Sequence, residues 1–166
     1  AVREGKVEAD ALAASMGGVI PMASAVGVEF HEVGAAFAAM SRTGTDANEA
    51  ATQINCILGA LMKPSKQAED ALRSLGVSSG DLRAELKEKG LLATLQHLYE
   101  LFGDNETAAS LVFGNVRALK GVLSMMGSAA EGTEIIFDKL TNTTGDTAKA
   151  FAYISETAGF KMNQAM

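Results

Sequence analysis

Glycine and proline recur along this chain at intervals of one short helix, and this spacing constrains the fold more than any other feature. The clearest part is residues 27–76, where Gly27, Gly44, Pro64 and Gly76 separate three segments with a helical pattern. Glycine readily takes the left-handed conformation that ends a helix, and proline disfavours helix in the residue before it. We therefore expect three short helices here.

The apolar residues of these three segments recur at steps of three and four, which is the spacing of one face of an α-helix. They are Phe30, Val33, Phe37 and Met40 in the first segment, Ala50, Ile54, Ile57, Leu58 and Leu61 in the second, and Ala68, Leu72 and Leu75 in the third. Asp46 stands three residues before Glu49, and Ser65 follows Pro64. Such side chains accept hydrogen bonds from free amides at a helix start, so both are expected N-caps.

The rest of the chain continues the same pattern. Further helices are expected over residues 1–16, 19–26, 81–89, 91–102, 105–126, 133–140 and from 146 onward, with Gly90 between the third and fourth. No run alternates apolar and polar residues over a strand length, and β-branched residues do not cluster. The sequence predicts an all-α fold of about eight or nine short helices, packed antiparallel or irregularly, in one module spanning residues 1–166.

The order of these boundaries resembles one known family. Its motifs are Gly27-Val28-x-Phe30, Gly44-Thr45-x-Ala47-x-Glu49-Ala50-Ala51-Thr52-Gln53, Leu61-Met62-Lys63-Pro64-Ser65 and Leu72-x-x-Leu75-Gly76-Val77. In this order they resemble the core region of phage tail tape measure proteins, most specifically over residues 12–92 and less so over 105–166. Members are much longer, and this chain begins at Ala1 inside a helical pattern, so we expect a fragment of a longer protein.

The resemblance implies a structural protein of a phage or prophage and no enzyme. Tape measure proteins scaffold tail assembly, set tail length and are released during DNA ejection. The implied partners are other tape measure copies, tail tube proteins and tail-tip proteins. The implied locations are the tail lumen of the virion and, during assembly, the cytoplasm of the bacterial host.

The charge balance argues against binding of nucleic acid. The chain carries 14 Lys and Arg against 20 Asp and Glu, a formal net charge of -6, and the basic residues are scattered among acids. Nucleic-acid-binding domains usually show a basic stripe or patch. Cys56 is the single cysteine and lies among Ile54, Ile57 and Leu58, so it is interpreted as a small apolar packing residue.

Residues 11–28 contain no charged side chain, which approaches the length of a membrane span. Alanine, glycine and serine dominate the segment, Gly17-Gly18 interrupts it, and Pro21 follows. These residues supply little transfer energy into lipid, so two buried helical pieces are favoured. The alternative function is a membrane-active segment that assists DNA passage across the host inner membrane.

No arrangement of catalytic or metal-binding residues emerges. His31 and His97 are far apart and are expected to be solvated or to cap helices, so neither a metal site nor a cofactor is predicted. The carboxylate pairs Glu29/Glu32 and Asp81/Glu85 stand at helix starts and are expected to be exposed. A cell-wall hydrolase needs a partly buried acid, so this third function is disfavoured. Met125 and Met126 point in different directions on one helix, so exposure of one as an adaptable partner surface is an alternative, but core packing is favoured for both.

Small residues inside two helices are the interaction candidates. Gly34 and Ala38 share one face of the first helix of the 27–76 region, and Gly59 lies inside the second. A glycine in a helix interior costs about 1 kcal/mol relative to alanine. We interpret Gly34 and Gly59 as places where another helix, of this chain or of a second copy, packs closely.

Replacing Gly34 with leucine is expected to lower the melting temperature, because a crossing helix would be forced away at an overpacking cost of roughly 1–3 kcal/mol. Thermal melting and light scattering of Gly34→Leu test this. An exposed glycine would respond in the opposite direction, since leucine is the better helix former. A higher melting temperature with unchanged assembly would show that no helix packs there.

Overall fold

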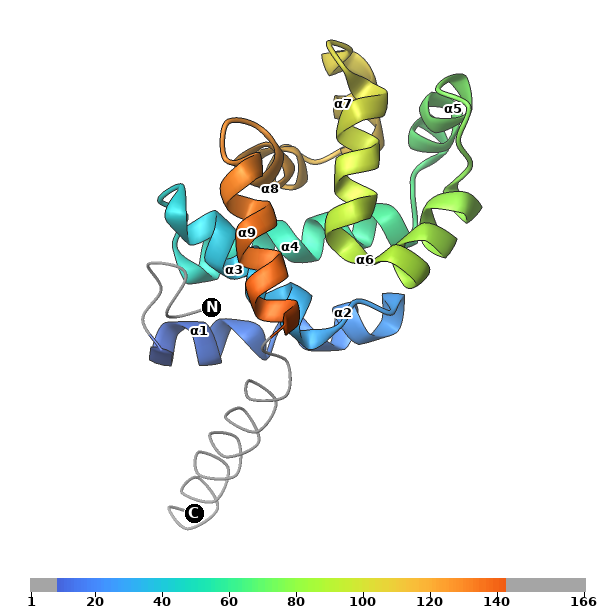
Figure 1. Cartoon of the computed structure of the whole chain (residues 1–166). Coiled ribbons are helices and arrows are strands. Elements are labelled where there is room, and N and C mark those ends of the chain that lie inside the picture. The colour runs from blue at the N-terminus through green and yellow to red at the C-terminus, as the bar shows by residue number, and fades with distance from the viewer. Residues whose placement is uncertain (1–8, 143–166) are drawn as a thin grey trace.

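The computed structural model describes residues 9–142, and over this range the chain forms nine α-helices and no strand (Figure 1). The helices are α1 (Ala9–Met16), α2 (Ile20–Val26), α3 (Phe30–Arg42), α4 (Ala47–Met62), α5 (Lys66–Ser74), α6 (Ser79–Phe102), α7 (Glu106–Phe113), α8 (Val116–Met126) and α9 (Ala130–Asn142). The all-α prediction is confirmed. The helix expected from residue 146 onward lies outside the described residues.

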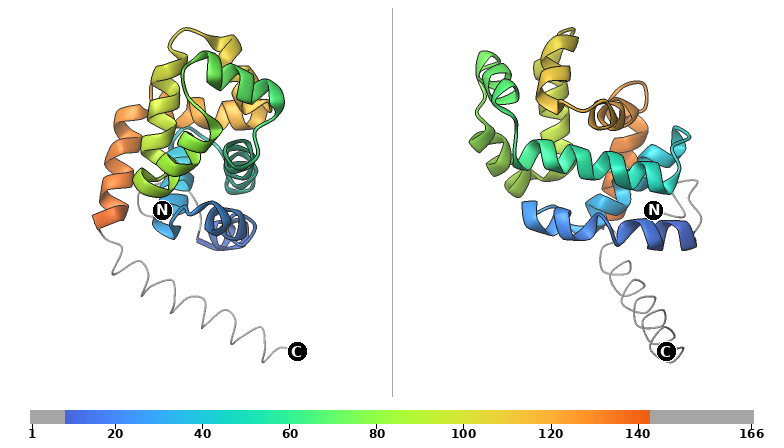
Figure 2. Two further views of the ribbon diagram at one scale, coloured as in Figure 1. Left: turned by 90° about the vertical axis from the view of Figure 1, so that its right-hand side faces the viewer. Right: turned by 180° about the vertical axis from the view of Figure 1, so that it is seen from behind.

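The helices pack in crossed layers around α4. Helices α1 and α2 form a row along one side of α4, while α9 and the second half of α6 stand across it (Figures 1 and 2). Two polar contacts fix the row to α4: Ser15 donates to Asn48 Oδ1 at 2.9 Å, and Asn55 Nδ2 donates to the carbonyl of Gly18 at 3.0 Å. The uncharged segment 11–28 is therefore two short helices on the body of the fold.

Helix α3 is the centre of the core. Residues 32–41 of α3 are all buried, because α9, α4, α8 and α2 surround it. Val33, Phe37 and Met40 are fully enclosed, and Phe30 is half-buried at the helix start. The predicted apolar stripe of this helix is confirmed. Its other faces are lined by alanines, whose small size lets several helices approach α3 at once.

The predicted helix boundaries between residues 27 and 76 are confirmed in detail. Asp46 Oδ1 accepts from the amide of Glu49 at 2.9 Å, and Ser65 Oγ accepts from the amide of Ala68 at 3.1 Å. Helix α4 ends at Met62, two residues before Pro64. Gly44 takes a φ of 92°, in the left-handed region that favours glycine. Local sequence thus determines where these helices begin and end.

Helix α6 is bent at Gly90, which has φ 85° and ψ 179°. The bend compensates for a change in the direction of the apolar stripe between the two halves of α6. In a straight helix, turning about 100° per residue, the stripe of Leu82 and Leu86 would lie about 170° from the stripe of residues 91–102. One of the two stripes would then face water. The bend at Gly90 brings both into one core, where Leu82, Leu86 and Leu91 are all buried.

The prediction of one long helix over residues 105–126 is wrong. Gly114 adopts a left-handed φ of 54° and ends α7, and Asn115 starts α8 by accepting a hydrogen bond from the amide of Arg117. Val112, Val116, Leu119 and Leu123 recur at steps of four and three, which on one straight helix would form a single stripe. With the break, Val112 is buried, but Val116 is 82% exposed and Leu123 is 50% exposed on the surface of α8.

One smaller prediction also needs correction. Helix α9 begins at Ala130, three residues before the expected start at Thr133, and contains Gly132 within its first turn. Met125 and Met126 are both buried, so the favoured core packing is confirmed and the alternative of an exposed methionine is not. They occupy two sides of α8, and each side meets a different part of the core because α8 packs against α4, α3 and α9.

Gly121 on α8 lies tightly against α4 and α3. A Cβ atom added there would lie 3.0 Å from Ile57 Cδ1, 3.1 Å from Gln53 Cβ and 3.1 Å from Met40 Cε. At Gly59, a Cβ atom would meet nothing within 4 Å. The expectation that another helix of this chain packs closely on Gly59 is therefore wrong for the described residues. The close crossing of α4 and α8 depends on Gly121 instead.

Replacing Gly59 with alanine and replacing Gly121 with alanine should change the stability of the chain in opposite directions. Gly59→Ala should stabilise the chain by roughly 0.5–1 kcal/mol, because alanine is the better helix former and space is free. Gly121→Ala should destabilise it, since an overpacking cost of about 1–3 kcal/mol exceeds the same helical gain. Denaturant unfolding of both variants measures the two changes. A stabilised Gly121→Ala variant would show that the crossing is loose.

Candidate functional site

The three small-residue candidates do not form one surface. Gly34 and Ala38 lie in the buried part of α3, so the chain itself covers their face. Gly59 lies half-exposed on α4, where it borders a shallow pocket of about 240 Å³ together with Cys56 and Ala60. Cys56 packs partly against the core, as expected of an apolar packing residue. Of the three candidates, only Gly59 is accessible to another molecule.

Glu32 is a buried carboxylate, which corrects the expectation that it is exposed. Its Oε1 accepts from the amide of Leu91 at 2.7 Å, and its Oε2 accepts from the amide of Glu29 at 3.0 Å. It therefore caps two helix starts, that of α3 and that of the second half of α6. A Cβ atom at Gly90 would collide with this carboxylate, so the bend requires glycine there.

Both oxygens of Glu32 are used in holding backbone amides. The hydrolase was disfavoured because these carboxylates were expected to be exposed, and this expectation is wrong for Glu32. The two hydrogen bonds to backbone amides nevertheless give Glu32 a structural use that accounts for its burial. Over residues 9–142, no group of three or more His, Cys, Asp or Glu side chains is placed to hold a metal ion.

A second acidic contact spans the bend in α6. His97 Nδ1 lies 2.5 Å from Glu85 Oε2, and Lys89 Nζ lies 3.1 Å from Glu85 Oε1. Residues twelve apart would be about 18 Å apart along a straight helix, so only the bend allows this contact. Burial raises the pKa of Glu85, but hydrogen bonds from His97 and Lys89 outweigh it, and the pKa lies below its ordinary value.

Glu85 and the two histidines were expected to be more exposed. The side chain of Glu85 is 12% exposed because the bend closes over it. The side chain of His31 is also 12% exposed, with Nδ1 3.1 Å from Glu29 Oε2. His97 keeps 39% of its side-chain surface exposed. These positions are set by packing between helices, which a single-helix pattern does not reveal.

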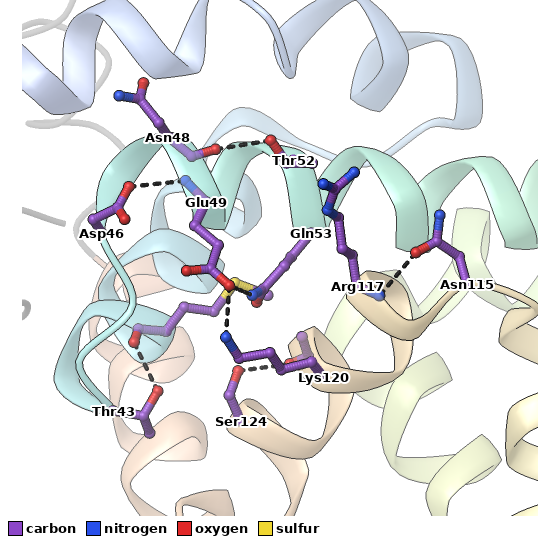
Figure 3. A network of polar contacts seen from close by, with 12 residues as sticks. Thr43, Asp46, Asn48, Glu49, Thr52, Gln53, Asn115, Arg117, Lys120 and Ser124 are labelled. Carbon is purple, nitrogen blue, oxygen red and sulfur yellow. Dashed lines mark hydrogen bonds and ion pairs between the residues drawn. The ribbon is translucent and has the colours of Figure 1, made fainter.

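A third polar cluster joins α4 to α8 (Figure 3). Lys120 Nζ on α8 donates to Glu49 Oε1 on α4 at 2.6 Å, and Gln53 Nε2 donates to the same oxygen at 2.9 Å. The hydrogen bond and the positive charge of Lys120 lower the pKa of Glu49. Arg117 also extends beside α4 in this view. The basic side chains of α8 are therefore gathered on the side of the helix that faces α4.

A groove of about 640 Å³ lies where the end of α6, α7 and α8 meet. Its apolar wall includes Phe102, Phe113, Leu119 and Val122, with the partly exposed Tyr99 and Leu123 at the edge. Asp104 and Glu106 supply carboxylates, and no Lys or Arg lines it. The break at Gly114, missed from the sequence, produces this groove by turning α8 away from the line of α7.

A sequence match accompanies this helical architecture. The pattern of the phage-related minor tail protein family matches residues 1–115, well over half of the chain. The chain belongs to this family. The matched part includes α1 to α7 and the buried contact between Glu32 and the bend in α6.

A curated relative agrees with the family match. The chain is 24% identical over 178 aligned positions to a tape measure protein of Pneumococcus phage Dp-1, with 99% of this chain covered. The alignment covers 14% of that relative, so the chain spans a small part of its length. No solved structure matches the chain significantly. The family resemblance seen in the order of helix boundaries is confirmed.

Replacing Gly90 with alanine should destabilise this minor tail family chain more than replacing Gly44. Both glycines have positive φ, but only Gly90 lies against the Glu32 carboxylate. We expect about 1–2 kcal/mol for Gly44→Ala from the left-handed backbone alone. We expect roughly 3 kcal/mol or more for Gly90→Ala, because a buried hydrogen bond is disturbed as well. Equal losses in denaturant unfolding would contradict this account of Glu32.

The contact between Lys120 and Glu49 should stabilise the fold in a pH-dependent way. The pKa of Glu49 in the folded chain lies below its ordinary value of 4.5, so the stabilisation from this contact is present above pH 4.5 and is lost as pH falls through the folded pKa. The stability difference between the wild type and Lys120→Met should therefore shrink below pH 4.5. Lys66→Met, at a lysine without an ion pair among the described residues, is the control. A difference that is constant between pH 7 and pH 3 would refute the assignment.

Proposed function

We propose that this chain is a compact helical module of a tape measure protein and acts as a scaffold in tail assembly. The family match and the relative from Pneumococcus phage Dp-1 support this proposal. Its partners are other tape measure copies, tail tube proteins and tail-tip proteins. It is present in the host cytoplasm during assembly, then in the lumen of the virion tail, and it leaves the tail during DNA ejection.

The observation that carries a scaffold role for this segment is the interruption of its helices. A tape measure converts chain length into tail length most directly as a continuous helix, at about 1.5 Å per residue. Among residues 9–142, the longest helix, α6, is bent at Gly90, and each of the other helices spans 16 residues or fewer. Such a module provides surfaces for partners, while the length of the tail is set by the rest of the parent protein.

The membrane-active alternative rests on the uncharged segment 11–28. In this fold, Leu12, Met16, Val19 and Ala23 are buried within the chain. Across the described part of the chain, no helix combines the length and the apolar composition needed to cross a membrane. The apolar side chains of the segment are thus used in packing against the fold. Leakage of dye from liposomes on addition of the folded chain would favour the alternative over the scaffold.

Deleting residues 9–142 in frame from the parent tape measure protein tests the scaffold role. We expect few or no tails by electron microscopy, with the remaining tails close to normal length. Normal numbers of tails shortened by about 200 Å would instead show that the segment measures length, at about 1.5 Å per deleted residue. Normal numbers of tails of unchanged length would show that it has no part in assembly. Either result would overturn the proposal.

A further inference from the structure

Helix α8 has two apolar faces, and the described chain covers only one of them. The covered face contains Ala118, Gly121, Val122 and Met125, which pack into the core. The other carries Val116, Leu119 and Leu123, spaced at three and four residues so that they form one row. Val116 and Leu123 are exposed, and Leu119 is half-buried. The row is therefore an apolar surface that no helix of the described residues covers.

This row runs into the groove between α6, α7 and α8. Leu119 and Leu123 of α8, Phe113 of α7 and Tyr99 of α6 all line it. Phe113 is almost fully buried, so the accessible apolar surface of the groove comes mainly from Tyr99, Leu119 and Leu123. A groove of this kind suits the apolar stripe of a helix, whose anchors recur at three- and four-residue steps.

The charged residues that line the groove are all acidic. Asp104 and Glu106 are both exposed, both line the groove, and no basic residue does. Lys120, the lysine beside the apolar row on α8, is turned toward α4 and held by Glu49 at 2.6 Å. The edge of the groove therefore presents carboxylates without a compensating cation, and charge complementarity favours a basic partner.

We propose that this groove binds an amphipathic helix of a partner protein, with an apolar stripe flanked by Lys or Arg. The stripe packs on Tyr99, Leu119 and Leu123, and the basic residues meet Asp104 and Glu106. Because the partner is cationic, binding weakens as salt screens these charges. The proposal concerns the groove alone and does not depend on the scaffold role in tail assembly.

Two labelled helical peptides with the same leucine pattern test the proposal, one with lysine and one with glutamate at the remaining positions. Fluorescence anisotropy with the full 166-residue chain measures their affinities. We expect the lysine peptide to bind at least about tenfold more tightly than the glutamate peptide, a difference of about 1.4 kcal/mol. Equal affinities, or no binding of the lysine peptide, would overturn the proposal.

Matched variants locate the binding. Leu123→Gln should weaken the lysine peptide at least roughly tenfold, as expected for an apolar anchor in a groove. Ile135→Gln on α9 is the control, because Ile135 is 49% exposed against 50% for Leu123 but does not line the groove. Asp104→Asn with Glu106→Gln should remove most of the preference for lysine over glutamate. Equal losses in Leu123→Gln and Ile135→Gln would show non-specific adsorption.

The oligomeric state separates a peptide-like partner from a second copy. Analytical ultracentrifugation of the wild type and Leu123→Gln compares their masses over a range of concentrations. We expect the same mass for both. A wild-type dimer that Leu123→Gln abolishes would show that a second copy covers the groove, and the proposed basic helix would then be wrong. All of the replaced residues are exposed, so melting temperatures close to the wild type are expected.

Discussion

The hydrogen bonds of the Glu32 carboxylate are the constraint on which much of this fold depends. A buried carboxylate is costly unless its oxygens are satisfied, and here each accepts from a backbone amide at the start of a helix. Helix starts favour negative charge because their free amides point outward. One side chain therefore fixes the position of α3 relative to the second half of α6, although the two are 59 residues apart at this contact.

The bend that Glu32 holds organises the surrounding polar groups. Because α6 folds back at Gly90, Glu85 meets His97, and the apolar stripes on either side of the bend enter the same core. A straight α6 would separate Glu85 from His97 and would expose one stripe. Gly90, the Glu32 carboxylate and the shift in the apolar pattern are thus three requirements of one local structure. Their connection cannot be read from the sequence alone, because Glu32 is distant from Gly90 along the chain.

The small and the apolar residues of the described chain serve different places in the structure. The small residues of α3 and α8 are used to pack helices together, whereas Tyr99, Val116 and Leu123 expose apolar surface in or beside the groove at α8. The acidic residues at that groove favour a positively charged partner.

The sequence by itself determined the fold class, the helix ends between residues 27 and 76, and the family. These features depend on neighbours within a few residues: Asp46 and Ser65 cap the amides that follow them, and Gly44 and Pro64 limit the helix before them. The family resemblance could be recognised because it too consists of such local boundaries in a fixed order.

Only the tertiary structure decided which faces are covered. The break at Gly114 exposes Val116 and Leu123, although their spacing fits a buried stripe equally well. Likewise, Gly34, Gly59 and Gly121 are all glycines inside helices, but Gly34 and Gly121 are buried between helices, whereas Gly59 has open space beside it. Helical periodicity shows which residues share a face, whereas the position of a neighbouring helix depends on contacts between distant segments.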